Sequence, residues 1–285
     1  MEYYNTEEAA KIIGVNVSTI KRWSSAGKLK CIRTAGGHRK FEMQHLVEFV
    51  ERNTDTKIQA SAIKLEKSNG SHLNEWVLKA DYHNLATYIQ MQAVKCNKRN
   101  ILEILKGLVL SKKPIYEIYD LLLTPILHNL GALWAEGQLT VTEEHFASQT
   151  LKDAIIRMQG MMSAPEKKRG NVMAMNLNNE MHDIVLKMVD HILEQKGFKV
   201  LFSGQLTPQI YLDNIFSDYA PKRLYISSTY VEDVNGCQKE FDDICEIAER
   251  HSIKIYVGGQ GFDRIRYDKP IVAERLYTFK DVFTK

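Results

Sequence analysis

The residues with the clearest potential for chemistry form the segment Glu180-Met181-His182-Asp183, in which an imidazole lies close to two carboxylates. A neutral imidazole is a good axial ligand for a transition metal, because a neighbouring acid fixes its tautomer and increases its basicity. We therefore expect His182 to be a metal ligand, supported by Glu180 and Asp183.

A second group of candidate residues comes earlier in the chain, where Trp134 is followed after nine residues by Glu144-His145. Gly137 lies in the loop between them. Taken alone, this spacing favours ordinary roles, since a Trp at a helix end is usually a core residue and a Glu-His neighbour pair on a helix is usually solvated. A contact with a ligand is the alternative interpretation.

The sequence around His182 predicts an α/β domain over residues 167–285. Short apolar runs alternate with helical stretches, which is typical of a parallel, doubly wound sheet. In such sheets ligands bind outside the carboxyl ends of the strands, so the loops that follow the strands are expected to meet there. The predicted strands are residues 171–175, 200–202, 224–226 and 253–257.

Residues 72–163, which include Trp134 and Glu144-His145, are predicted to form a four-helix bundle. The pattern changes to helical spacing with short joins, and this indicates a small antiparallel bundle. The helical patterns cover about 73–89, 101–110, 114–130 and 142–162. Residues 54–71, which precede the bundle, are polar and are predicted to be a linker.

The positive charge of the chain is concentrated in residues 1–53. They hold nine Lys/Arg against six Asp/Glu, whereas the rest of the chain has 29 of each. Residues 9–41 contain eight Lys/Arg and no acid. Such a distribution is expected of a surface that faces nucleic-acid phosphates.

Two short helices are predicted within this basic region. Thr6 is expected to cap the first, which ends at Gly14, and the second begins near Ser18; two helices across a glycine-containing turn are typical of a helix-turn-helix. The second helix is expected to read base edges in a major groove. The candidate reading residues are Ser18, Thr19, Lys21 and Arg22, and the residues expected to face inward are Ala9, Ile13, Val15 and Ile20.

A two-stranded wing is predicted next, where extended runs at 29–33 and 38–41 flank a tight turn at 34–37. The basic side chains of the wing are expected to lie along the phosphate backbone, fixing register without reading sequence. These side chains are Arg33, His38, Arg39 and Lys40.

The composition of the whole chain limits its class. The 285 residues, 44% hydrophobic and 26% charged, are typical of a soluble protein with more than one domain. No long apolar run or signal peptide is present, so we expect a cytoplasmic protein with no membrane partner. The four cysteines form no C-x-x-C pair, and no nucleotide-binding or hydrolase motif appears, so no enzyme is expected.

All three modules resemble parts of one known family. Residues 4–41 resemble the DNA-binding domain of MerR-type regulators, most specifically in the wing motif Arg-Thr-x-Gly-Gly-His-Arg-x-Phe at 33–41. Glu180-x-His182 resembles the Asp/Glu-x-His-x-x-Gly motif of cobalamin-binding domains, and Trp134 with Glu144-His145 resembles the W-x9-E-H pattern of their helical cap. Residues that resemble the companion motifs around the nucleotide tail are Ser227, Ser228, Gly258 and Gly259, and Leu206-Thr207-Pro208 is similar to the loop after the second strand.

This order of modules resembles the CarH, CarA and LitR family of light-responsive repressors. The resemblance implies a dimer or tetramer on a near-palindromic double-stranded DNA operator. It also implies adenosylcobalamin held between His182 on one side and Trp134 with Glu144-His145 on the other. Light-driven loss of the adenosyl group would then change the fit of the cap and so shift the population of DNA-bound assemblies.

Two residues depart from the family pattern. Val185 stands where the motif has Gly, and a branched side chain can obstruct the nucleotide tail. Ala135 follows Trp134, where light-sensing members place a His that captures cobalt. The chain then uses another residue for this purpose, binds another corrinoid or tetrapyrrole, or keeps the fold without a cofactor. A corrinoid methyl-carrier protein is a further alternative, because such carriers share the bundle, the fold and the His motif.

Overall fold

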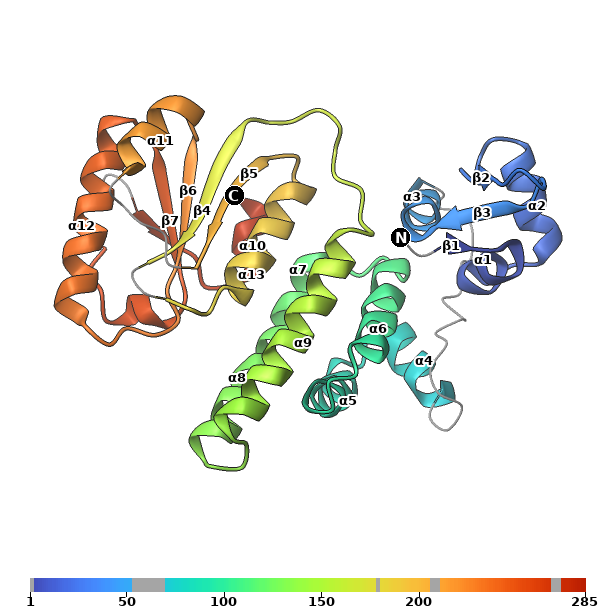
Figure 1. Ribbon diagram of the computed structural model, residues 1–285, viewed down its shortest axis with the longest axis horizontal. Coiled ribbons are helices and arrows are strands. Elements are labelled where there is room, and N and C mark those ends of the chain that lie inside the picture. Colours follow the sequence, from blue (N-terminus) through green and yellow to red (C-terminus); the bar gives the residue numbers. More distant parts are fainter. Residues whose placement is uncertain (1–2, 53–69, 178–179, 206–210, 268–272) are drawn as a thin grey trace. The chain divides into compact units, whose positions relative to one another are not determined.

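The computed structural model describes residues 3–52, 70–177, 180–205, 211–267 and 273–285 (Figure 1). The chain divides into two compact units, Met1–Ser163 and Ala164–Lys285. The predicted linker at 54–71 falls outside the described residues except at its last two positions, where a helix begins. No helix among the described residues combines the length and the apolar character that crossing a membrane requires.

The first unit begins with a helix-turn-helix and a wing, as predicted. A small antiparallel sheet in the order β1-β3-β2 joins the wing to the segment that precedes the first helix. The strand β1 was not expected, because two residues are too short to show an alternating pattern. The elements are β1 (Tyr3–Tyr4), α1 (Thr6–Ile13), α2 (Val17–Ser25), β2 (Ile32–Arg33), β3 (Arg39–Glu42) and α3 (Met43–Arg52).

Two details of the helix-turn-helix differ from the sequence prediction. The cap of α1 is Asn5 and not Thr6, because Asn5 Oδ1 accepts from the backbone N–H of Glu7 and Glu8, both at 2.9 Å. The backbone N–H of Asn5 in turn donates to Glu8 Oε2 at 2.9 Å, and this second bond completes a capping box. Val15 is only half-buried, whereas the other three residues expected to face inward are fully buried.

The middle of the chain is a helical bundle. The predicted first helix is two helices, because Ala80 adopts a φ of 53° and interrupts the helix between α4 and α5. The predicted third helix contains a π-helical turn at Tyr119–Leu123. The helices are α4 (Gly70–Lys79), α5 (Tyr82–Val94), α6 (Lys98–Leu110), α7 (Ile115–Ile118), α8 (Thr124–Ala135) and α9 (Val141–Gln159).

The second unit is the predicted doubly wound sheet, with parallel strands in the order β5-β4-β6-β7-β8. Helices α10 and α13 cover one face and α11 and α12 cover the other (Figure 1). The fifth strand was not expected, because β8 has no apolar run. The elements are β4 (Asn171–Asn176), α10 (Ile184–Gln195), β5 (Lys199–Gly204), α11 (Leu212–Tyr219), β6 (Arg223–Ser227), α12 (Val234–Arg250), β7 (Lys254–Gly258), β8 (Ala273–Arg275) and α13 (Phe279–Thr284).

The strand order places a topological switch point between β4 and β6. The chain leaves β4 toward β5 on one side and then crosses to β6 on the other, so the loops after the two strands diverge at the carboxyl ends, where folds of this class bind ligands. The register sets Asn176 beside Ser227 and Ser227 beside Gly258. Three polar or small residues therefore lie in one row at the edge where this fold binds ligands.

Candidate functional site

The predicted DNA-reading residues lie on the outer side of α2. Ser18, Lys21 and Arg22 are exposed and Thr19 is half-buried, while Ile20 of the same helix is fully buried. One helix therefore presents polar side chains to solvent and uses its apolar side to hold its position.

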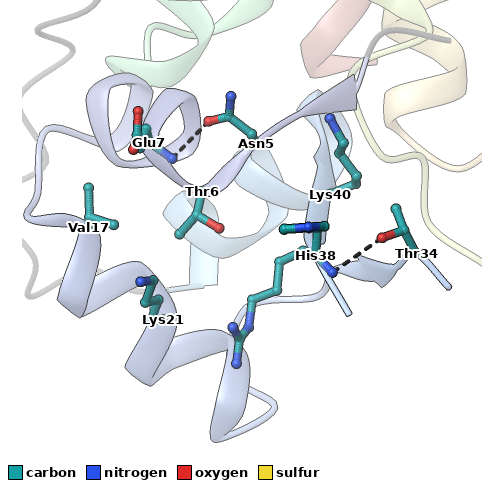
Figure 2. Close-up of a pocket in the computed structure, with 9 residues that line it drawn as sticks. Asn5, Thr6, Glu7, Val17, Lys21, Thr34, His38 and Lys40 are labelled. Carbon is teal, nitrogen blue, oxygen red and sulfur yellow. Dashed lines mark hydrogen bonds between the residues drawn. The ribbon is translucent and has the colours of Figure 1, made fainter. Parts of the chain in front are cut away.

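A cleft of about 490 Å³ separates α2 from the wing (Figure 2). Lys21 lines it from α2, and His38, Arg39 and Lys40 line it from the wing. Lys21, Arg39 and Lys40 bring three positive charges to this concave surface, and Glu7 at the start of α1 brings one negative charge. A DNA phosphate is a chemically suitable occupant, because lysine and arginine side chains are the usual donors to phosphate oxygens.

The wing is held in shape by local hydrogen bonds. The backbone N–H of Thr34 donates to the His38 carbonyl at 3.0 Å. The N–H of His38 donates to Thr34 Oγ1 at 3.2 Å, which is the dashed line between these residues in Figure 2. Gly37 has a φ of +76°, which favours glycine in this turn. The wing is consequently a defined hairpin.

Charges on the wing also favour an anionic partner. Arg33 lies directly opposite Arg39 in the β2–β3 pair, and like charges in this position destabilise a sheet. Arg39 Nη2 donates to Ser25 Oγ at 2.8 Å, which ties the wing to the end of α2. The repulsion between the two guanidinium groups would decrease if a phosphate lay beside them.

His182 lies in the loop between β4 and α10, and Glu180 holds its ring. The Nδ1 atom of His182 is 2.6 Å from Glu180 Oε1, and the same oxygen accepts from the His182 N–H at 2.8 Å. Glu180 Oε2 accepts from the backbone N–H of Thr229 at 2.6 Å and of Tyr230 at 3.0 Å. The Glu180 carboxylate therefore connects the loop after β4 to the loop after β6.

Burial and hydrogen bonding act in opposite directions on Glu180. The side chain is 2% exposed, and burial would raise its pKa. The hydrogen bond with His182 and the three backbone donors outweigh this effect and hold the pKa of Glu180 below its ordinary value. The carboxylate is thus stable as a buried anion, while the His182 side chain remains 57% exposed and accessible to a ligand.

The sequence predicts two supporting acids for His182, and in the structure Glu180 accepts the hydrogen bonds of His182. Asp183 is largely buried at the N-cap position of α10, where its carbonyl accepts from the Lys187 N–H at 2.8 Å. Val185, the first departure from the family pattern, lies in the first turn of the same helix and is half-buried.

Two buried polar atoms at the strand ends lack a hydrogen-bond partner among the described residues. They are Ser227 Oγ and Asn176 Oδ1, which lie on neighbouring strands. Asn176 Nδ2 donates weakly to the carbonyls of Glu180 and His182, at 3.3 and 3.4 Å. Because buried polar atoms are normally paired, this pair of atoms fits a polar ligand group at the switch point.

A glycine loop follows β7 and lies against Ser228. Gly259 has a φ of +94°, and a Cβ atom at this position would overlap the Ser228 carbonyl. A Cβ atom at Gly261 would overlap the Ser228 side chain, whereas one at Gly258 would make only an ordinary contact. Glycine is therefore required at 259 and 261 for the close approach of the two loops.

The residues predicted for the helical cap lie around the turn between α8 and α9. Trp134 is 51% exposed, so the ordinary interpretation of it as a core residue is wrong. Glu144 Oε2 is 2.8 Å from His145 Nδ1, and Ser148 Oγ donates to Glu144 Oε1 at 2.5 Å. Ala135 is the last residue of α8. The cap residues thus present an indole and a Glu-His pair on the surface of the bundle.

Several residues at the sheet edge were not predicted from the sequence. The missed groups are Asn176, Gly261 and the backbone donors at Thr229 and Tyr230. An asparagine at the end of an otherwise apolar strand was an available signal for Asn176. The loop predicted at 206–208 lies outside the described residues.

Two families of known proteins match separate parts of the chain. Residues 3–54 match the helix-turn-helix domain family. Residues 89–158, which include Trp134 and Glu144-His145, match the B12 binding domain family. The match to the second family lies in the helical bundle.

Individual proteins are similar over most of the chain. The HTH-type transcriptional repressor CarH of Myxococcus xanthus is 23% identical over 219 residues, covering 72% of each chain. Dimethylamine corrinoid protein 3 of Methanosarcina acetivorans is 22% identical over 181 residues, covering 63% of this chain and 84% of that protein. The solved structure of the Methanosarcina barkeri monomethylamine corrinoid protein has a TM-score of 0.58 at 15% identity, covering 71% of this chain and 96% of that one.

The chain therefore combines a segment similar to helix-turn-helix domains with a segment similar to B12 binding domains. The predicted resemblance to CarH-type repressors is confirmed, and so is the predicted fold, a helix-turn-helix, a helical bundle and a parallel-sheet domain like that of corrinoid proteins.

Proposed function

We propose that this protein is a transcription repressor whose affinity for a DNA operator is controlled by a bound cobalamin. The observation that carries the proposal is the buried Glu180 carboxylate holding the exposed His182 at the β4–β6 switch point. This site occurs in a chain that also has a helix-turn-helix with a cationic cleft. A ligand site and a DNA-binding face in one chain are what a ligand-controlled regulator requires.

The residues at the switch point fit a corrinoid. His182 would provide a nitrogen ligand to the metal of the corrinoid, with its tautomer fixed by Glu180. Ser227 Oγ and Asn176 Oδ1 would gain partners in the nucleotide tail, beside the close approach of Ser228 and the glycine loop. We assign Ser228, Gly258 and Gly259 to the walls of the tail site and Asp183 to its edge.

Trp134, Glu144 and His145 are proposed as contacts of the upper face of the same ligand. An exposed indole offers a flat apolar surface of the kind that covers a macrocycle. Adenosylcobalamin would supply a light-sensitive cobalt–carbon bond, and we propose it as the ligand and light as the signal.

We propose that the DNA contacts come from both parts of the cleft. Ser18, Thr19, Lys21 and Arg22 would face base edges and nearby phosphates, and Arg33, His38, Arg39 and Lys40 would face the backbone. A second copy of the chain is proposed as a partner, because a symmetric oligomer reads a palindromic operator with two identical faces. Control then follows if the ligand favours the assembly that binds DNA, since a ligand shifts an equilibrium by its differential affinity.

Retention of ligand in the dark tests the cofactor part of this proposal. The chain is mixed with adenosylcobalamin, passed through a gel-filtration column, and its visible spectrum recorded. We expect coloured protein for the wild type, and a changed spectrum or weaker retention for His182→Ala. Colourless wild-type protein would support the alternative of a cofactor-free fold, and retention of another tetrapyrrole instead would support the second alternative.

Binding to DNA separates the regulator from a corrinoid methyl carrier. We expect a gel shift on a fragment of the neighbouring promoters that disappears when the basic cleft is neutralised. A corrinoid-loaded chain that shifts none of these fragments would favour the carrier.

A further inference from the structure

Arg275, at the carboxyl end of β8, makes a contact with the glycine loop that the sequence does not signal. Its side chain is 8% exposed, which is unusual for a charged residue. Nη2 donates to the Gly259 carbonyl at 2.7 Å and to Asp263 Oδ1 at 3.0 Å. One buried guanidinium nitrogen therefore holds the backbone of the loop beside Ser228.

The rest of the Arg275 guanidinium is enclosed by aromatic rings. Its central carbon lies 5.5 to 5.9 Å from the ring centroids of Phe262, Tyr267 and Tyr277. Nε and Nη1 have no hydrogen-bond partner among the described residues. Rings of this kind stabilise a cation but also accept an apolar chain of the same length. A methionine side chain would keep the apolar contact with the rings but would lose the positive charge and the hydrogen bonds of Nη2.

The Gly259 carbonyl lies in the segment that forms the proposed tail site. The N–H of Ser228 donates to the Gly258 carbonyl at 3.0 Å, and the N–H of Gly261 donates to the Ser228 carbonyl at 2.9 Å. Hydrogen bonds at Gly258 and Gly261 therefore join the 258–261 loop to Ser228 on both sides of Gly259. The bond from Arg275 fixes the Gly259 carbonyl between them. Moving this carbonyl would change the space beside Ser227 and Ser228.

We infer that Arg275 is a positioning residue that holds the 258–261 loop in the shape that admits the nucleotide tail of a complete corrinoid. The inference rests on the proposed function, because the tail belongs to the proposed ligand. On this inference Arg275 determines the selectivity for complete cobalamin over cobinamide. Binding of complete cobalamin depends on the loop, whereas cobinamide, the same ring without the nucleotide, does not require it.

The test compares Arg275→Met with a matched control, Arg223→Met. Arg223 Nη1 donates to the Lys285 carbonyl, also at 2.7 Å, and its guanidinium lies over the rings of Phe198 and Tyr256. It belongs to the same sheet but lies at the amino end of β6, opposite the proposed site. Both substitutions remove an arginine bond to a backbone oxygen beside aromatic rings, and Arg275→Met also removes the contact with Asp263.

Absorbance titrations with hydroxocobalamin and with aquacobinamide measure selectivity in the full chain. We expect Arg275→Met to weaken hydroxocobalamin binding about tenfold, the usual effect of losing one charge-assisted hydrogen bond, and to change aquacobinamide binding less than about twofold. Arg223→Met keeps the wild-type ratio, and Arg275→Lys, which retains a donor, gives an intermediate ratio. A wild-type ratio in Arg275→Met, or an equal loss for both corrinoids, would overturn the inference.

Hydrogen–deuterium exchange of the ligand-free chain tests the positioning role without any corrinoid. The peptide that contains residues 258–263 should exchange faster in Arg275→Met and at the wild-type rate in Arg223→Met. Equal exchange in Arg275→Met and wild type would show that Arg275 does not position the loop. If the wild type binds neither corrinoid, the proposed function and the selectivity both fail, and the exchange rates still decide the effect of Arg275 on the loop.

Discussion

The proposed DNA-binding face and the edge of the parallel sheet are built in opposite ways. Exposed cations form the first, on α2 and a wing that are close together in the sequence. The second gathers buried or glycine-restricted groups from segments near residues 176, 180, 228 and 259. We therefore expect ligand affinity and fold stability to be separable at the proposed DNA-binding face, and to depend on the same atoms at the sheet edge.

The largest effect is expected from Gly259→Ala. The added Cβ would overlap the Ser228 carbonyl at a residue that already has a φ of +94°. We expect a loss of about 1–3 kcal/mol or more in unfolding free energy, together with loss of corrinoid binding. Urea denaturation and absorbance titration measure the two quantities.

The matched control is Gly258→Ala, one residue earlier, because a Cβ atom there would make only an ordinary contact with the Leu276 carbonyl. It should keep stability within about 0.5 kcal/mol of the wild type. Equal unfolding free energies for Gly259→Ala and Gly258→Ala would contradict the assignment of the close approach to Gly259.

The carboxylate that supports His182 gives the next effect. Glu180→Gln keeps the side-chain shape but removes the charge that holds the imidazole, so corrinoid affinity should fall about 10- to 100-fold. Asp183→Asn should lower it less than about threefold, because the observed bond to the ring comes from Glu180. An absorbance titration of both variants is sufficient, and a larger loss for Asp183→Asn would reverse the assignment of the two acids.

At the DNA-binding face, Lys21→Ala should reduce operator affinity about 10-fold while leaving stability within about 0.5 kcal/mol. The salt dependence of binding should also decrease by about one phosphate contact, which gel shifts at several salt concentrations measure. Lys95→Ala, an exposed lysine of the bundle, is the control and should change neither quantity. A strong decrease in the unfolding free energy of Lys21→Ala would contradict the expectation that affinity and stability are separable on α2.

The smallest effect concerns pH and the buried polar groups of the second unit. Burial and the nearby Lys187 lower the pKa of His191 in α10 to about 3. In the unfolded chain His191 therefore takes up a proton as the pH falls through about 6.5, whereas in the folded chain His191 stays neutral until about pH 3. Below about pH 6.5 the stability should fall with pH by up to about 1.4 kcal/mol per unit because of this residue.

His191→Leu should remove this part of the pH dependence, whatever its effect on stability at neutral pH. Urea denaturation between pH 7.5 and pH 5 measures the slope. An identical slope in variant and wild type would show that His191 does not titrate in this way.

The two regions also differ in how far the sequence could predict them. The helix-turn-helix and the wing follow from local spacing, caps and turns, so the error was small: Asn5 caps α1 in place of Thr6. The contact between His182 and Glu180 could be predicted because the two residues are close in the sequence, whereas the role of His182 as a metal ligand stays a prediction. The DNA-contact residues themselves stay predictions, although the structure places several of them on one cleft.

The sheet edge was less predictable because its geometry is set by pairing between distant strands. The register sets Asn176 beside Ser227, and the side chain of Arg275 reaches the Gly259 carbonyl only in the folded sheet, so neither contact could be predicted from the sequence. The strand β8 has no apolar pattern, because it lies at the edge of the sheet. Ala80 interrupts the predicted first helix of the bundle with a backbone conformation that its residue type does not favour.

The most direct test of the central claim is the affinity of the wild-type chain for a promoter fragment, measured by gel shift in the dark with and without adenosylcobalamin. The account predicts a change of about tenfold or more, a typical coupling between two sites, and no change for His182→Ala. Equal affinity of the wild-type chain in both conditions, at a ligand concentration that saturates its spectrum, would contradict the account.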